Sequence, residues 1–97
     1  MTPDHHWSEE DKELFQALLM IKTPAQMANF CRDLMTTKEI KEFSKRLQIA
    51  KLLETGKMSY KEIAKKTKSS TATVTRVNQW LNHGMNGYKI ALKNIKK

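Results

Sequence analysis

The sequence predicts an all-α protein of about six helices, and three observations support that prediction. Only three of the 97 residues are glycine and two are proline. Apolar residues recur three and four positions apart, which is the spacing of one helix face. Serine or threonine, followed three positions later by an acidic or amide side chain, precedes several of these runs, as at helix starts. A chain of this length is expected to form one domain, residues 1–97.

Two helices are predicted to follow a flexible arm at residues 1–7. The first begins at Ser8, and Thr23 caps the second, with Pro24 at its first position. Their apolar residues lie on more than one side and include Leu14, Phe15, Leu18 and Leu19, then Met27, Phe30, Cys31 and Leu34. The chain is too short to cover them all, so we expect residues 8–56 to supply the dimerisation helices of a homodimer.

The longest predicted helix starts at Thr36, which forms a capping box with Glu39. Gly56 is expected to end it in the left-handed conformation. The apolar residues of this helix repeat at helical spacing: Ile40, Phe43, Leu47, Ala50 and Leu52 or Leu53. A last helix is predicted at residues 87–95. Cys31, the single cysteine, forbids an internal disulfide and is expected to be a small core residue.

Residues 59–82 predict a helix-turn-helix, which is the most informative pattern in the chain. Ser59 and Glu62 form a capping box for its first helix. Residues 67–70 then favour a turn, and Ser70 is a good cap for the second helix. Such a pair of helices is the element with which many regulators read the major groove of DNA.

The two motif helices are expected to pack through small and branched residues. The second helix carries one apolar stripe, which consists of Val74, Val77 and Leu81. Ile63 and Ala64 of the first helix can receive Val74 where the helices cross. Lys68 occupies the turn position that requires a positive φ, which strains a residue other than glycine.

The distribution of charge indicates a polyanionic partner. Residues 1–37 hold three basic and six acidic residues, a net charge of −3, whereas residues 38–97 hold fifteen basic and four acidic residues, a net charge of +11. The positive charge therefore accompanies the helix-turn-helix, and double-stranded DNA is the natural partner. No signal peptide or membrane-spanning run is found, and no helix face has the aromatic residues and lysine rim of a membrane-surface helix. A cytoplasmic protein with no membrane partner is expected.

Catalysis and metal binding are not expected. The sequence has no glycine-rich phosphate loop, no Cys/His metal set and no serine in a strand–turn–helix setting. His5 and His6 lack a third ligand, so no metal site is predicted. His83 is better explained by a favourable interaction with the C-terminus of a helix. The chain is therefore expected to be neither an enzyme nor a cofactor-binding protein.

The outward faces of the two motif helices supply the candidate DNA contacts. The start of the first helix, Ser59, Tyr60 and Lys61, suits phosphate groups. The start of the second suits base edges, directly or through water, and comprises Ser70, Thr71, Ala72, Thr73, Thr75 and Arg76. The predicted function is a sequence-specific transcriptional regulator, with repression favoured. The alternative is a dimeric helical adaptor that binds an acidic protein, and steeply salt-dependent retention on DNA distinguishes the two.

Four motifs make the stretch from Leu34 to Leu81 similar to a known family. They are Leu34-Met35-Thr36, Arg46-Leu47-x-Ile49, Leu52-Leu53-x-x-Gly56-x-Met58-Ser59-x-x-Glu62 and Ala72-Thr73-Val74-Thr75-Arg76. This stretch resembles the Trp repressor family, and the whole chain resembles the YerC/YecD group within that family. The resemblance implies an intertwined homodimer that binds a two-fold-related operator, as the Trp repressor itself does.

The resemblance also implies a candidate small-molecule pocket. In the family, tryptophan lies between two arginines that correspond to Arg46 and Arg76. Two positions that hold small residues in the family hold Val77 and Trp80 in this chain. Both larger side chains add bulk where the ligand would lie. The candidate pocket therefore comprises Thr36, Arg46, Thr73, Arg76, Val77 and Trp80, with no response to tryptophan expected. Trp80 can fill the pocket with the protein's own indole, and any other small-molecule corepressor is left open.

Overall fold

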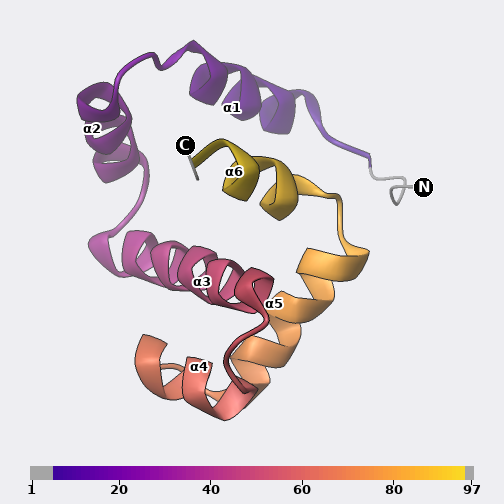
Figure 1. The fold of residues 1–97 in the computed structure, drawn as a ribbon. Helices are drawn as coiled ribbons and strands as arrows, with labels where there is room; N and C mark the ends of the chain where they lie inside the picture. Colours follow the sequence, from indigo (N-terminus) through magenta and orange to yellow (C-terminus); the bar gives the residue numbers. More distant parts are fainter. Residues whose placement is uncertain (1–5, 96–97) are drawn as a thin grey trace. The chain divides into compact units, whose positions relative to one another are not determined.

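The computed structural model describes residues 6–95 (Figure 1). This part of the chain forms six α-helices and no strand, which confirms the all-α prediction. The helices are α1 (Glu9–Met20), α2 (Pro24–Leu34), α3 (Thr37–Thr55), α4 (Tyr60–Thr67), α5 (Thr71–His83) and α6 (Gly87–Ile95). Most of the arm predicted at residues 1–7, including His5, lies outside the described residues, as do residues 96–97.

The first three helices begin at the caps that the sequence predicts, and the third ends at the predicted glycine. Ser8 forms a capping box at the start of α1, with hydrogen bonds of 3.0 and 3.1 Å. Thr23 caps α2, and Thr36 exchanges hydrogen bonds of 2.8 and 3.1 Å with the first turn of α3. Gly56 ends α3 with a φ of 67°, a left-handed conformation that glycine adopts without strain. These starts and stops are local, so the sequence is sufficient to place them.

The chain divides into two compact units between Lys41 and Glu42, within α3. The N-terminal unit, described here for residues 6–41, contains α1 and α2, neither of which has a buried residue. Cys31 is only half-buried, so its predicted core position is wrong for the isolated chain. The physical reason is that α1 and α2 have no second apolar layer of their own to pack against.

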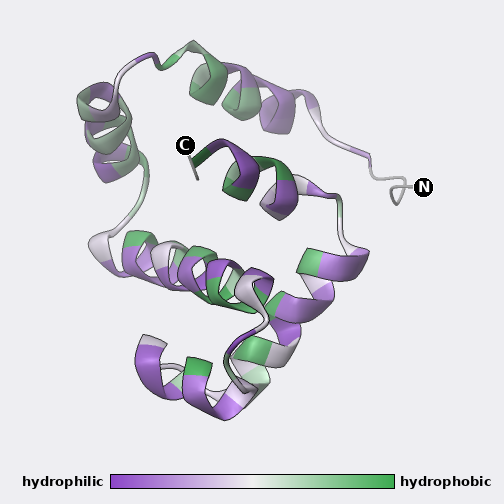
Figure 2. Cartoon of the chain, in the orientation of Figure 1, coloured by the Kyte–Doolittle hydropathy of each residue, from purple (hydrophilic) through white to green (hydrophobic). Residues whose placement is uncertain are grey.

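The C-terminal unit, described for residues 42–95, contains the remainder of α3 and α4 to α6, and it has a true core. α5 packs against both α4 and α6. The buried residues are Ile49, Ala50, Ile63, Ala64, Val74, Val77, Leu81 and Leu92. Figure 2 shows α4 as largely hydrophilic apart from a narrow hydrophobic band, as expected for a short helix that contributes only Ile63 and Ala64.

The core differs from the predicted apolar stripe of α3 at two positions. Ile49, which lies beside that stripe, is fully buried, whereas Phe43 within it is 46% exposed. Ala50 is buried as expected. The face of α3 that meets the helix-turn-helix is therefore centred between Ile49 and Ala50, and Phe43 remains on a more open side. Periodicity alone does not show where the neighbouring helices cross.

Candidate nucleic-acid interface

The first helix of the motif, α4, begins with a complete capping box. Ser59 Oγ accepts the N–H of Glu62 at 3.1 Å, and Glu62 Oε1 accepts the N–H of Ser59 at 2.8 Å. The Glu62 carboxyl has a pKa below its ordinary value, because it forms hydrogen bonds with the backbone and the hydroxyl of Ser59. The N–H groups of Tyr60 and Lys61, in the first turn, have no acceptor within the helix. They are the backbone donors with which this helix start can bind a phosphate.

The turn between α4 and α5 adopts the conformation that the sequence predicts. Lys68 has φ 57° and ψ 46°, a left-handed conformation that costs roughly 1 kcal/mol relative to glycine. Three contacts stabilise the turn. Ser69 N–H donates to Ala64 O at 2.9 Å, the hydroxyls of Thr67 and Ser69 are 2.8 Å apart, and Lys45 Nζ donates to Lys68 O at 3.2 Å. The last contact ties α3 to the turn.

The second helix, α5, is capped by Ser70 as predicted. Ser70 Oγ accepts the N–H of Thr73 at 3.1 Å and lies 3.0 Å from the Thr73 hydroxyl. Thr75 Oγ1 donates to Thr71 O at 2.9 Å. The proton of the Thr75 hydroxyl is therefore engaged within the helix, whereas the oxygen lone pairs and the methyl group of this exposed side chain remain available. A partner can meet Thr75 with a donor or with an apolar group.

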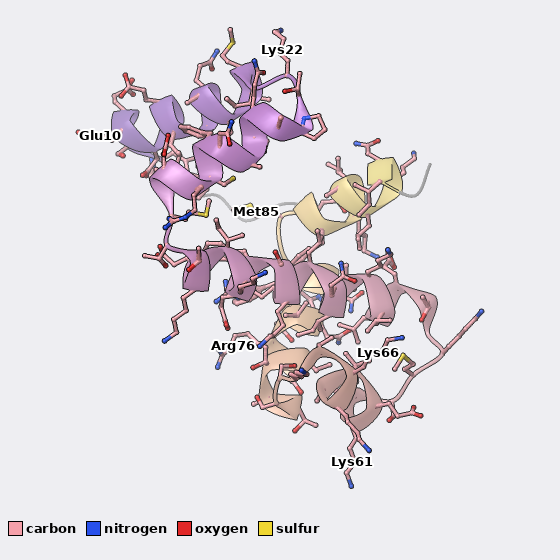
Figure 3. All side chains as sticks on the ribbon, turned by 90° about the vertical axis from the view of Figure 1, so that its left-hand side faces the viewer. Glu10, Lys22, Lys61, Lys66, Arg76 and Met85 are labelled. Carbon is pink, nitrogen blue, oxygen red and sulfur yellow. The ribbon has the colours of Figure 1, made fainter. Side chains whose placement is uncertain are left out.

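Burial separates the two faces of α5. Val74, Val77 and Leu81 are buried against the core, as predicted. On the opposite face the candidate contacts Thr71, Ala72, Thr75 and Arg76 are exposed. Four of the remaining candidates are also exposed: Ser59, Tyr60, Lys61 and Ser70. Thr73, which is hydrogen-bonded to Ser70, is half-buried. Figure 3 shows Lys61 of α4 and Arg76 of α5 extending outward from the helix pair.

The carboxylates of residues 6–95 do not neutralise the cations of the motif. Across residues 6–95 the only ion pair joins Lys12 to Glu9, at 3.5 Å, within α1. The exposed cations of α4, α5 and the turn between them are Lys61, Lys65, Lys66, Lys68 and Arg76. These unpaired charges remain available to a polyanion.

The structure brings together only part of the candidate small-molecule pocket. The Arg46 guanidinium carbon is 5.5 Å from the centroid of the Trp80 ring, and both residues line an open hollow of about 560 Å³. Val77 is fully buried, and neither Thr73 nor Arg76 lines this hollow. Thr36 belongs to the N-terminal unit, where its hydroxyl caps α3.

Two residues that the sequence did not indicate also line this hollow. They are Phe43 of α3 and Tyr88 of α6. Burial raises the pKa of the Tyr88 hydroxyl above its ordinary value, and the charge of Arg46 opposes that rise. The spacing of Phe43 and Arg46, three residues apart on a helix, is a signal that could have identified Phe43. No comparable signal links Lys45 to Lys68, because their contact spans 23 residues.

The capped helix pair, its left-handed turn and the exposed polar face of α5 define a helix-turn-helix protein. Comparison with known families narrows this class: the model of the Trp repressor protein family matches residues 9–96. The chain belongs to the Trp repressor family, whose members are DNA-binding regulators rather than enzymes.

Individual relatives agree with this assignment. The chain is 36% identical over 89 residues to YerC, an uncharacterised protein of Bacillus subtilis. The aligned stretch covers 92% of this chain and 85% of YerC. It superposes with a TM-score of 0.85 on a TrpR-like protein from Eubacterium eligens, with 37% identity, covering 92% of this chain and 91% of that one. A candidate Trp repressor from Staphylococcus aureus gives a TM-score of 0.85 and 33% identity, covering 93% and 89% of the two chains. The resemblance inferred from the motifs is confirmed.

Between residues 6 and 95, no helix has the length and apolar character needed to cross a membrane.

Proposed function

We propose that this protein is a sequence-specific DNA-binding transcriptional regulator that inserts α5 into the major groove. The observation that carries the proposal is the division of α5 into two faces. Thr71, Thr75 and Arg76 are exposed at its N-terminal half, whereas the aliphatic stripe is buried. A helix fixed by its apolar side and open on its polar side is suited to base edges.

Each part of the interface has a distinct task. Arg76 has the reach and fork geometry to bind a guanine edge or a phosphate. Ala72 and the methyl group of Thr75 suit a thymine methyl group. Tyr60 and Lys61, at the start of α4, suit phosphates that set the register without reading sequence. Affinity is then expected to fall steeply with salt.

We further propose that the protein acts as a homodimer on two half-sites about one helical turn apart. The support comes from apolar side chains that the single chain leaves exposed. In the N-terminal unit these are Trp7, Leu14, Phe15, Leu19, Met20 and Leu34. Burying such residues between two copies removes apolar area from water and stabilises both. We place this activity in the cytoplasm and expect repression, since a dimer on an operator blocks access to the same DNA.

Selection of bound sequences from a random duplex pool tests the proposed function. The expected result is a palindromic consensus that the Arg76→Ala variant no longer enriches. Binding of the selected duplex should weaken steeply with added salt. Failure to enrich any sequence, together with retention of an acidic protein that is insensitive to Arg76→Ala, would identify the protein as an adaptor and refute the proposal.

A further inference from the structure

The guanidinium of Arg46, on α3, lies over two aromatic rings. Its guanidinium carbon is 5.4 Å from the centroid of Phe43, one turn earlier on the same helix, and 5.5 Å from that of Trp80 on α5. No carboxylate in the described chain pairs with Arg46. A guanidinium at these distances is attracted to the ring faces, and its planar shape stacks there as an ammonium group does not.

Trp80 is the residue through which α5 reaches this arginine. It lies one position before Leu81, at the edge of the aliphatic stripe, and its side chain is 41% exposed. The stripe itself is held by hydrophobic contacts, which are not directional. Such contacts keep the apolar stripe of α5 turned toward the core. The contact of the Arg46 guanidinium with the Trp80 ring adds a directional contact beside the stripe.

Rotation of α5 matters because its exposed face is narrow. Successive residues of a helix differ by about 100° in direction. A modest rotation therefore moves Thr75 and Arg76 away from the direction in which both face a partner. α5 packs mainly against α4 and α6, so the contact of Trp80 with Arg46 is a separate link to α3.

We propose that Arg46 is a positioning residue for DNA recognition, which fixes the rotation of α5 through Trp80 and does so without a bound small molecule. The inference rests on the proposed function, because it concerns the presentation of the same α5 face. The Arg46 guanidinium already lies over the Trp80 ring. As part of the chain, this ring competes at a high effective concentration with any free aromatic ligand that enters the neighbouring hollow.

Four variants test the proposal, all made in a Trp7→Phe background, which leaves Trp80 as the only tryptophan wherever position 80 is unchanged. Arg46→Met and Trp80→Ala should each weaken binding of the selected operator roughly 3- to 10-fold, the range expected for a partly exposed cation–π contact. Trp80→Phe, which keeps a ring, should lose less. The double variant Arg46→Met/Trp80→Ala should be no weaker than the worse single variant, because both changes remove one contact.

The salt dependence separates positioning from direct DNA contact. If Arg46 acts through Trp80, Arg46→Met keeps the salt slope and the affinity for nonspecific duplex. If Arg46 binds a phosphate, the slope falls by about one unit and the proposal is overturned. Lys51→Met is the matched control, since Lys51 is an exposed cation on the same helix, and it should keep the operator preference. If the losses of operator-binding free energy in the two single variants add fully in the double variant, the proposal is also overturned.

The fluorescence of Trp80 keeps this test independent of DNA binding. In the Trp7→Phe background, Arg46→Met should shift the emission to longer wavelength and increase quenching by acrylamide, with an unchanged circular dichroism spectrum. Unchanged emission would refute the contact even if no operator is found, whereas failure to find any operator refutes the proposed function alone. Adding indole or L-tryptophan should leave operator binding by the wild-type protein unchanged. Tighter operator binding in the presence of either compound would overturn the claim that α5 is positioned without a bound small molecule.

Discussion

Arg76 is the only arginine of α5, and it projects from the exposed face of that helix (Figure 3). No carboxylate in residues 6–95 pairs with it, so removing its charge breaks no ion pair of the folded chain. The buried neighbours that support α5, Val74 and Val77, do not depend on it. At the scale of single residues, recognition and stability are therefore separable.

We expect Arg76→Ala to weaken operator binding by roughly 1–3 kcal/mol, because a base or phosphate contact is lost. Thermal unfolding should change little, since the side chain is exposed. Titration of the selected duplex against both proteins measures the difference. Asn82→Ala, at an exposed position near the end of the same helix, is the control and should bind as the wild type does. Equal operator affinity for Arg76→Ala and the wild type would exclude Arg76 as a contact.

At the scale of elements, the motif depends on how its helices start and how its turn is closed. Ser59 and Ser70 cap α4 and α5 with side-chain hydrogen bonds. Lys68 has a left-handed conformation in the turn between them. Lys45 donates to the carbonyl of Lys68, and the hydroxyls of Thr67 and Ser69 hydrogen-bond to each other on either side of it.

Lys68→Gly should raise the free energy of unfolding by roughly 0.5–1 kcal/mol, because relief of left-handed strain outweighs the greater entropy of the unfolded chain. The carbonyl of residue 68 remains available to Lys45. Urea unfolding measures the change. The matched control is Lys65→Gly inside α4, which should lower stability by about 1 kcal/mol. A loss of stability in Lys68→Gly would show that the lysine side chain, rather than the backbone, stabilises the turn.

Acid should weaken the start of α4 through Glu62. Because the pKa of Glu62 is lowered in the folded protein, its contribution is present above the ordinary value of 4.5 and is lost as pH falls through the folded-state pKa. Glu39, at the start of α3, should behave alike. The pH dependence of thermal unfolding below pH 4.5 measures this effect, and it should be smaller in Glu62→Gln. An unchanged acid profile in that variant would contradict the prediction.

At the scale of the whole molecule, the two units differ in how they achieve burial. The C-terminal unit encloses eight buried residues, whereas α1 and α2 enclose none. Leu19 is 75% exposed in the single chain, although it is one of the apolar residues of α1. In the proposed homodimer a second copy covers these residues, which would explain why they are apolar. The stability of the protein should then depend on its concentration.

Leu19→Glu should shift the protein toward monomer, because it places a charge in the proposed apolar interface. Light scattering after size exclusion measures the mass, and the thermal midpoint of the wild-type protein should rise with concentration. Gln16→Glu on the same helix adds the same charge at an exposed polar position and should remain dimeric. A wild-type protein that is monomeric at micromolar concentration would refute the homodimer.

The sequence by itself determined the six helices, their caps, the left-handed turn at Lys68 and the polar face of α5. All of these depend on residues within about one helical turn of each other, where spacing and side-chain chemistry suffice. Only the tertiary structure decided that Ile49 is buried and Phe43 is not, that Lys45 binds the carbonyl of Lys68, and that Arg46 meets Trp80. These contacts join residues far apart in the chain, and they depend on where helices cross, which no local pattern encodes.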